Sequence, residues 1–245
     1  MKKTIIALAV AASSLPALAQ KAPEPNYTLS ANVGLFSDYR FRGVSQTANK
    51  PALQGGFDFA HKSGFYAGNW NSSISTFDFD SATQIGSSGL ESDFYAGYKV
   101  DLGGFGLDFG NIYYYYAGEG VTDLAQLNEV YVGLSYGPVN FKSYYTTSDG
   151  SAGVAAKGSY YHLLSVAFPL SDTISLKGSY GAFVAKENAV SYRDYSVGLA
   201  FDMGEGWSLG VSYIGTSGDA KDLNQGTALE DLYKSGAVVS ISRSF

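Results

Sequence analysis

The residues of this 245-residue chain best suited to chemistry are charged side chains that recur at alternating positions. They include both signs: Arg40, Arg42, Lys99, Lys142 and Lys177, and Glu91, Asp93, Asp108, Glu129 and Asp194. In an extended strand every second side chain lies on the same face. These charges would therefore gather on one face of a sheet. Inside a closed sheet, rings of charge select which ions or solutes pass.

Arg40 and Arg42 are the most distinctive pair, because two guanidinium groups two residues apart on a strand point the same way. Such a pair could hold an anionic group through bidentate hydrogen bonds. Arg40 and Arg42 could instead pair with Asp38, or contact loops or lipopolysaccharide at a rim. More generally, the inward charges could pair with one another and plug the lumen rather than line an open path.

An enzyme site is a weaker alternative. Ser143 and His162 share the apolar face of two neighbouring predicted strands, as a nucleophile and its base would in an outer-membrane phospholipase. No Asn or Asp on that face stands beside them to orient the histidine. His61 has no second histidine near it in sequence, and the chain has no cysteine. We therefore predict no catalytic set, no metal site and no cofactor.

The elements that position these residues are strands. After residue 26, polar and apolar residues alternate with a period of two, which indicates half-buried strands. In residues 90–102, Leu90 and Phe94 share one face, and Glu91 and Asp93 share the other. We predict about twelve strands, starting near residues 27, 51, 64, 90, 106, 128, 138, 158, 172, 192, 206 and 235.

The connections between these strands alternate between long and short. The stretch 75–89 is long and LGG at 102–104 is short, then 117–127 is long and Gly137-Pro138 is short. Outer-membrane barrels have long loops outside the cell and short periplasmic turns. We therefore predict one antiparallel up-and-down transmembrane β-barrel over residues 27–245, preceded by a flexible lead-in at 20–26.

The first nineteen residues are typical of an export signal. Lys2 and Lys3 precede an apolar stretch, and Ala17-Leu18-Ala19 fits the signal-peptidase site, so we expect cleavage after Ala19. The stretch is shorter than the roughly 20 residues of a transmembrane helix. Cleavage would remove two lysines and change the net charge of −6 to −8. That charge argues against nucleic-acid binding, which requires a basic surface.

Aromatic residues make up 15% of the chain and support the barrel, because its two interfaces favour amphipathic rings. One predicted belt, at the periplasmic end, holds Phe57, Phe59, Tyr66, Tyr98, Tyr136, Phe168, Phe201, Trp207 and Phe245. The other belt, at the outer end, holds Tyr39, Phe41, Tyr113, Tyr115, Tyr145, Tyr160 and Tyr213. The terminal Phe245 resembles the signal that barrel assembly machinery reads, although Arg243 departs from the usual apolar residue.

Three segments resemble one bacterial family. SDYRFRGVSQT at 37–47, PALQGGFDF at 51–59 and GFYAGNWNSSI at 64–74 resemble the TorF-like porin family of proteobacteria, the Gcw_chp proteins. Asp38, Tyr39, Arg40, Arg42 and Gly43 match its most recognisable segment. The resemblance implies an outer-membrane barrel assigned as a porin, and it implies neither a substrate nor a catalytic set.

We therefore expect an outer-membrane protein of a Gram-negative bacterium that lets small solutes or ions diffuse passively. Its expected partners are membrane lipid and lipopolysaccharide, the assembly machinery and small solutes, and it could be a monomer or a trimer. The main alternative is a non-conducting barrel whose long loops, such as 75–89 and 216–234, bind a surface ligand.

Overall fold

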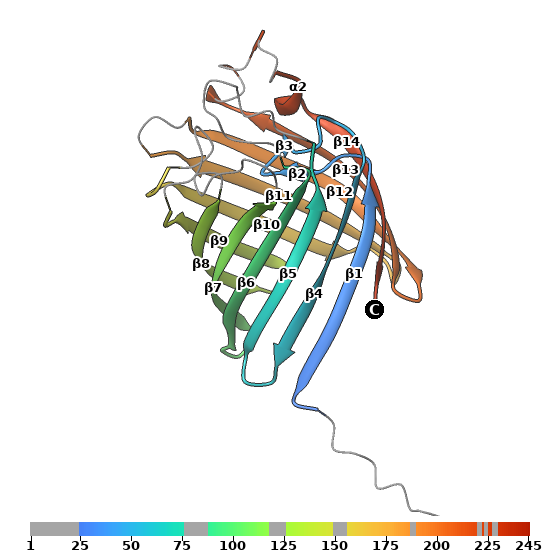
Figure 1. Cartoon of the computed structure of the whole chain (residues 1–245). Coiled ribbons are helices and arrows are strands. Elements are labelled where there is room, and N and C mark those ends of the chain that lie inside the picture. Colours follow the sequence, from blue (N-terminus) through green and yellow to red (C-terminus); the bar gives the residue numbers. More distant parts are fainter. Residues whose placement is uncertain are drawn as a thin grey trace, which may run out of the picture.

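Twelve antiparallel strands close into a barrel in the computed structural model (Figure 1). The structure describes residues 25–75, 88–117, 126–148, 156–186, 190–219, 222, 225–226 and 230–245. The barrel strands are β1 (Tyr27–Phe36), β4 (Ala52–His61), β5 (Phe65–Ser73), β6 (Leu90–Asp101), β7 (Phe105–Ala117), β8 (Leu127–Tyr136), β9 (Val139–Thr146), β10 (Tyr160–Pro169), β11 (Ile174–Val184), β12 (Tyr192–Gly204), β13 (Trp207–Ser217) and β14 (Gly236–Ser244). From β4 to β14 each barrel strand pairs with the next, and β1 closes the barrel by pairing with both β4 and β14. The predicted fold is confirmed.

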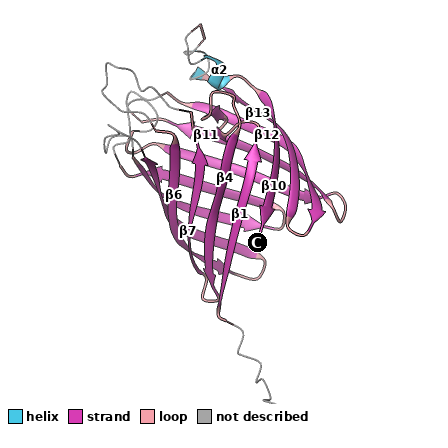
Figure 2. Cartoon of the chain, turned by 45° about the vertical axis from the view of Figure 1, so that its right-hand side comes forward, coloured by secondary structure: helices cyan, strands magenta, loops and turns pink. Residues whose placement is uncertain are grey.

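The alternation of long and short connections divides the barrel into two ends. Short turns join β4 to β5, β6 to β7, β8 to β9, β10 to β11 and β12 to β13, and they lie at what we call the short-turn end. The opposite, long-loop end carries the short helix α2 (Glu230–Tyr233), which Figure 2 places above the strands. The predicted signal peptide at 1–19 lies outside the described residues.

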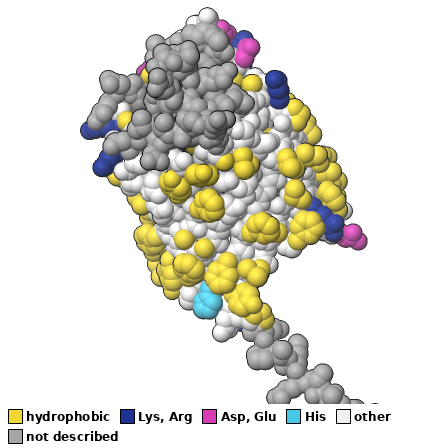
Figure 3. Space-filling model, viewed as in Figure 1, with side chains coloured by type: hydrophobic (Ala, Val, Ile, Leu, Met, Phe, Trp, Pro, Cys, Tyr) yellow, Lys and Arg dark blue, Asp and Glu magenta, His cyan; other side chains and the backbone are white. Residues whose placement is uncertain are grey.

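The outer face of the barrel is apolar. Leu134, Val197, Val211 and Val239 are between 42% and 54% exposed, although each belongs to a regular strand. Hydrophobic side chains cover the visible barrel wall in Figure 3. An exposed apolar band of this kind is what a strand barrel presents to lipid. No helix in the described part of the chain is long and apolar enough to cross a membrane.

Most of the predicted aromatic belts are exposed on the outer face. Tyr98, Tyr136 and Trp207 lie near the short-turn end and are 39–61% exposed. Tyr113 and Tyr213 lie nearer the long-loop end and are 38% and 49% exposed. Because long stretches of strand alternate strictly, their outward phase could be read correctly from sequence.

Three aromatic positions in those belts were predicted wrongly. β1 ends at Phe36, and the chain then turns inward, so Tyr39 is 7% exposed and packs inside the barrel with Phe41. Tyr66 also points inward, because its hydroxyl hydrogen-bonds to Asp108. Both faces of the segment around Tyr66 are mixed in polarity, so alternation could not set its phase.

Candidate functional site

The first long connection, residues 37–51, folds into the barrel instead of extending away from it. We call it the lumen hairpin. It contains β2 (Arg40–Phe41) and β3 (Val44–Ser45), joined by the two-residue turn Arg42-Gly43. Both turn residues have positive φ, 49° and 82°, as a type I′ hairpin turn requires. A Cβ on Gly43 would lie 2.7 Å from side-chain atoms of Asp194 and Thr216, so the tip of the hairpin contacts β12 and β13.

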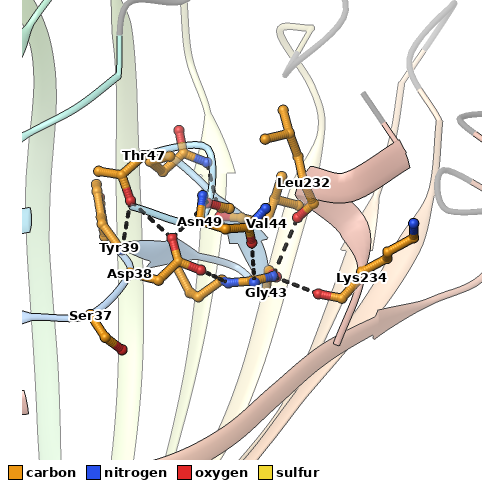
Figure 4. A network of polar contacts seen from close by, with 12 residues as sticks. Ser37, Asp38, Tyr39, Gly43, Val44, Thr47, Asn49, Leu232 and Lys234 are labelled. Atoms are coloured by element: carbon orange, nitrogen blue, oxygen red, sulfur yellow. Dashed lines mark hydrogen bonds and ion pairs between the residues drawn. The ribbon is translucent and has the colours of Figure 1, made fainter. Parts of the chain in front are cut away.

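The base of the lumen hairpin is built around Asp38 (Figure 4). One carboxylate oxygen accepts hydrogen bonds from Ser45 Oγ at 2.6 Å and Thr47 Oγ1 at 2.9 Å. The other oxygen is ion-paired with Arg40. The Thr47 hydroxyl in turn accepts the backbone N–H of Tyr39 at 3.1 Å. These bonds satisfy a carboxylate that is 6% exposed and fix the hairpin's fold.

Arg40 ties the lumen hairpin to α2 and to the residue that follows it. Its guanidinium donates to the carbonyl oxygens of Leu232 at 3.3 Å and Lys234 at 2.7 Å, and to Asn49 Oδ1 at 2.7 Å. A cavity of about 420 Å³ at the long-loop end is lined by Asp38, Arg40, Asn49 and Lys234, among other residues. Arg40 is thus occupied by protein oxygen atoms. The anticipated pairing of Arg40 with Asp38 is what the structure contains.

Arg42 reaches across the lumen to a different carboxylate. Its Nη2 lies 2.5 Å from Glu129 Oε2, with the two side chains 6% and 0% exposed. Glu129 also accepts hydrogen bonds from Tyr114 at 3.2 Å and Thr146 at 3.3 Å. The two guanidinium groups therefore serve separate partners, and the structure does not bring them together around one anion.

Aromatic rings surround the Arg42 guanidinium. Its central carbon lies 4.2 Å from the ring centre of Tyr161, 4.7 Å from that of Phe41 and 5.6 Å from that of Tyr144. Burial alone would lower the pKa of Arg42, but Glu129 together with Tyr114 and Tyr192 outweighs burial and raises that pKa above its ordinary value. Arg42 is therefore a permanently charged group enclosed by a carboxylate and aromatic faces.

Tyr39 anchors the hairpin on β6. Its hydroxyl donates to Glu91 Oε1 at 2.8 Å, and its ring lies 5.2 Å from that of Trp70. Burial raises the pKa of Tyr39, so the hydroxyl remains a hydrogen-bond donor. The other oxygen of Glu91, Oε2, and Oδ1 of Asp93 are buried and have no hydrogen-bond partner among the described residues.

A second polar network lies towards the short-turn end. Lys142 Nζ is 2.8 Å from Asp108 Oδ2, and Tyr66 donates to Asp108 Oδ1 at 2.6 Å. Lys142 also stands 4.4 Å from the ring centre of Tyr131, and Lys99 stands 4.8 Å from that of Tyr66. Three of these residues, Lys99, Asp108 and Lys142, line a cavity of about 710 Å³. The charges predicted for β6, β7, β8 and β9 thus face the lumen.

Glycines opposite the lumen tyrosines make room for their rings. A Cβ on Gly110 would lie 2.4 Å from ring and hydroxyl atoms of Tyr131, and a Cβ on Gly68 would lie 2.5 Å from the ring of Tyr95. Flat rings over bare backbone let the barrel carry large lumen side chains without spreading its strands. The sequence pattern alone did not predict these contacts.

We expect Gly110→Ala to destabilise the folded barrel by about 1–3 kcal/mol, because the added methyl group overpacks against Tyr131. The free energy of unfolding measured by denaturant titration in lipid vesicles tests this. Gly178→Ala is the matched control, since its Cβ would meet Val166 at an ordinary 3.4 Å. Equal losses of stability in the two variants would contradict the role given to Gly110.

The opposite wall of the lumen, from β10 to β14, is lined by small side chains. Its inward positions include Ser165, Ser179, Ser196, Gly198, Ser208, Gly210, Ser212, Ser240 and Ser242, and all of them are partly exposed. Small inward side chains leave more of the lumen unfilled than the tyrosines opposite them do. The wall from β5 to β9 thus holds most of the charges and tyrosines, whereas the wall from β10 to β14 is rich in serines and glycines besides Tyr161, Lys177 and Asp194, and we call this second wall the serine wall.

The ten predicted pore-lining residues fall into two groups. Eight of them lie on barrel strands, while Arg40 and Arg42 lie on the lumen hairpin. Lys177 and Asp194 lie on β11 and β12, where Asp194 accepts a hydrogen bond from Tyr161 at 3.0 Å. Whether these residues line a conducting path remains a prediction. Sequence reasoning missed the tyrosines that contact Arg42 and Asp194. Tyrosine is amphipathic and is compatible with both the lipid-facing and the lumen-facing side of a strand, so polarity alone did not assign these side chains to the lumen.

Ser143 and His162, the alternative enzyme pair, lie directly opposite each other on β9 and β10. The histidine ring is stacked against Phe141 and Tyr160, with ring centres 6.2 and 5.8 Å away. Its Nδ1 is buried without a hydrogen-bond partner in the part of the chain that the structure describes. A catalytic base needs a hydrogen-bonded nucleophile and an orienting group, and neither contact is present for His162 in those residues.

The bacterial family described as "Bacterial protein of unknown function (Gcw_chp)" matches residues 20–245. The chain belongs to this family. No curated protein matches the sequence.

Solved structures of porins share the fold of this Gcw_chp protein. The KdgM porin superposes with a TM-score of 0.56 at 8% identity, covering 88% of this chain and 99% of the porin. The NanC porin superposes with a TM-score of 0.54 at 12% identity, covering 89% of this chain and 99% of the porin. At such identities the likeness establishes a common barrel architecture and leaves function to the lumen.

Proposed function

We propose that this Gcw_chp protein is an outer-membrane channel of a Gram-negative bacterium for passive diffusion of small solutes or ions, and that it is not an enzyme. The main observation that supports this proposal is the serine wall, whose inward residues are small and partly exposed within a closed barrel. The apolar outer face supports a lipid surround, with the long-loop end outside the cell and the short-turn end in the periplasm. The export signal and the interaction of Phe245 with assembly machinery belong to the same proposal.

The lumen hairpin supplies the constriction of this channel. It contacts Glu91 on β6, Glu129 on β8, and the wall beside Asp194 on β12. Such a crossing narrows the lumen near the long-loop end and leaves the cavity beside Asp108 and Lys142 below it. Solutes would cross this level beside the hairpin and then follow the serine wall towards the short-turn end, where side chains are smallest.

The decisive experiment is the single-channel conductance of the refolded mature protein in a planar bilayer. Discrete current steps from protein whose folding is verified by heat-modifiable gel mobility would support the channel. Silence from the folded wild type and from variants with a released hairpin would favour the alternative, a structural barrel with ligand-binding loops.

A substitution on the serine wall locates the path. We expect Ser212→Tyr to reduce conductance by roughly half or more, because a large ring would occupy the accessible side of the lumen. Val211→Tyr is the matched control: it adds the same ring at the adjacent position, on the lipid-facing side, where Val211 is 42% exposed. Equal conductance in the two variants would exclude the serine wall as the route.

A further inference from the structure

The Arg42 guanidinium is held as a bound ligand would be held. Arg42 belongs to the lumen hairpin, but Glu129, Tyr144 and Tyr161, which contact it, belong to three successive barrel strands. A planar cation paired with a buried carboxylate and flanked by aromatic faces is the arrangement by which proteins bind organic cations. The barrel wall thus forms a cation pocket independently of the hairpin that fills it.

The wall around this pocket carries more carboxyl groups than the hairpin has guanidinium groups to pair with them. At the hairpin, the described residues provide the carboxylates Asp38, Glu91, Asp93, Glu129 and Asp194, and the guanidinium groups of Arg40 and Arg42. Glu91 and Asp93 are 1% and 5% exposed, and each has a buried oxygen without a partner in those residues.

These unpartnered oxygens are connected to the pocket. Tyr114 lies directly opposite Asp93 in the register of β6 and β7, and the Tyr114 hydroxyl donates to Glu129. A buried carboxylate without a partner is costly, and a positive charge brought beside it relieves that cost. A cation that enters the pocket would therefore find further carboxyl oxygen atoms as acceptors on Glu91 and Asp93.

The hairpin holds its position through these wall contacts rather than through its own backbone preference. Arg42 has a φ of 49°, a left-handed conformation that is unfavourable for residues other than glycine. Arg42 is the turn residue whose side chain pairs with the wall, so loss of its contacts would leave the tip held by the packing of Gly43 against Asp194 and Thr216. A solute that takes the place of Arg42 would loosen the tip, while Tyr39 and Arg40 would still hold the base of the hairpin.

We propose that Glu129, Tyr114, Tyr144 and Tyr161 form a binding site for the guanidinium group of a solute, which Arg42 occupies as a tethered competitor. Binding of the solute displaces Arg42 and widens the constriction. This deepens the proposed function, and its consequence for transport rests on that function, whereas binding is measurable without any current. A short tether has an effective concentration of roughly millimolar order, so competition is expected with millimolar solute.

The test is binding of methylguanidinium to the refolded full-length mature barrel, measured by saturation-transfer NMR of its methyl signal. Arg42→Ala should bind methylguanidinium with a dissociation constant of roughly millimolar order, and the wild type should bind it about twofold more weakly because of the tether. Glu129→Gln added to Arg42→Ala should weaken binding at least about tenfold. Methylurea, the neutral isostere of methylguanidinium, should bind neither the wild type nor either variant.

The controls separate the pocket from general lumen charge. Asp58→Asn added to Arg42→Ala is the matched control for Glu129→Gln. It removes a different lumen carboxylate, which is hydrogen-bonded to Tyr95, and should leave methylguanidinium binding unchanged. If Arg42→Ala does not refold, Arg42→Gln keeps a longer, uncharged side chain than alanine and also removes the cation from Glu129. Equal binding with and without Glu129, or equal binding of methylurea, would overturn the site.

A parallel bilayer recording distinguishes failure of the site from failure of the channel. A folded barrel that binds methylguanidinium through Glu129 but carries no current in any variant would keep the site and overturn the channel. A conducting Arg42→Ala barrel that shows neither binding nor a current change with methylguanidinium would overturn the site and keep the channel.

Discussion

Replacing Glu129 with leucine is expected to raise single-channel conductance roughly twofold or more, because the constriction loses its anchor. The substitution leaves Arg42 buried at 6% exposure beside rings and without its carboxylate. An unpaired buried charge costs about 3–5 kcal/mol. The guanidinium can avoid that cost only by leaving the wall, and the hairpin tip must then leave with it. Current recordings in a planar bilayer measure the change directly.

The double variant Arg42→Met with Glu129→Leu shows whether charge or volume holds the hairpin. Both charges are replaced by apolar groups of comparable size, so nothing forces the tip away from Tyr144 and Tyr161. Replacing a buried ion pair in this way is often close to neutral in free energy. We expect conductance near that of the wild type. A double variant as open as Glu129→Leu would show that hydrogen bonds to Glu129, rather than relief of a stranded charge, position the hairpin.

The strands of this barrel could be predicted because lipid and lumen impose opposite polarity on alternate residues. β6 illustrates this: Leu90 and Phe94 face outward, while Glu91 and Asp93 are buried inside. Where the alternation is strict, one phase satisfies both environments and the other satisfies neither. Predicted and observed strand starts consequently agree to within about two residues, inside the usual error of strand boundaries.

The lumen hairpin could not be predicted by the same rule, because it continues the alternation of β1 without continuing the strand. Tyr39 and Phe41 have the parity of outward residues, yet they pack inside against residues such as Trp70 and Tyr114. The local signal for a turn is Arg42-Gly43, since glycine accepts the positive φ at its second position. That signal gives a hairpin but not its direction, which depends on Glu129, far along the chain.

The two walls of the lumen have different roles in the site: one binds the hairpin, and the other borders the proposed solute path. Bulky side chains on β5 to β10 hold the charges and bind the hairpin through Tyr39 and Arg42. Serines and glycines such as Ser196, Gly198 and Ser212 lie nearer the short-turn end than Asp194 and Thr216, which the hairpin tip contacts. A symmetric lumen of large residues would be filled by its own side chains. The asymmetry lets one barrel contain both a rigid binding wall and a path beside it.

Val211→Arg is expected to destabilise the barrel by about 2–4 kcal/mol in lipid vesicles, because it places a charge on the lipid-facing side near mid-strand. Val211 is 42% exposed, and Leu199 and Val239, which flank it on β12 and β14, are also exposed and apolar. Ser212→Arg puts the same charge on the lumen side of the next residue, where water can solvate it, and should cost less than about 1 kcal/mol. Free energies of unfolding from denaturant titration in vesicles give the comparison.

On a surface that faces water, an exposed substitution would change stability by no more than about 0.5 kcal/mol. A neutral Val211→Arg would therefore contradict a lipid surround for this wall, whereas a loss confined to Val211→Arg would fix which side of β13 meets the membrane.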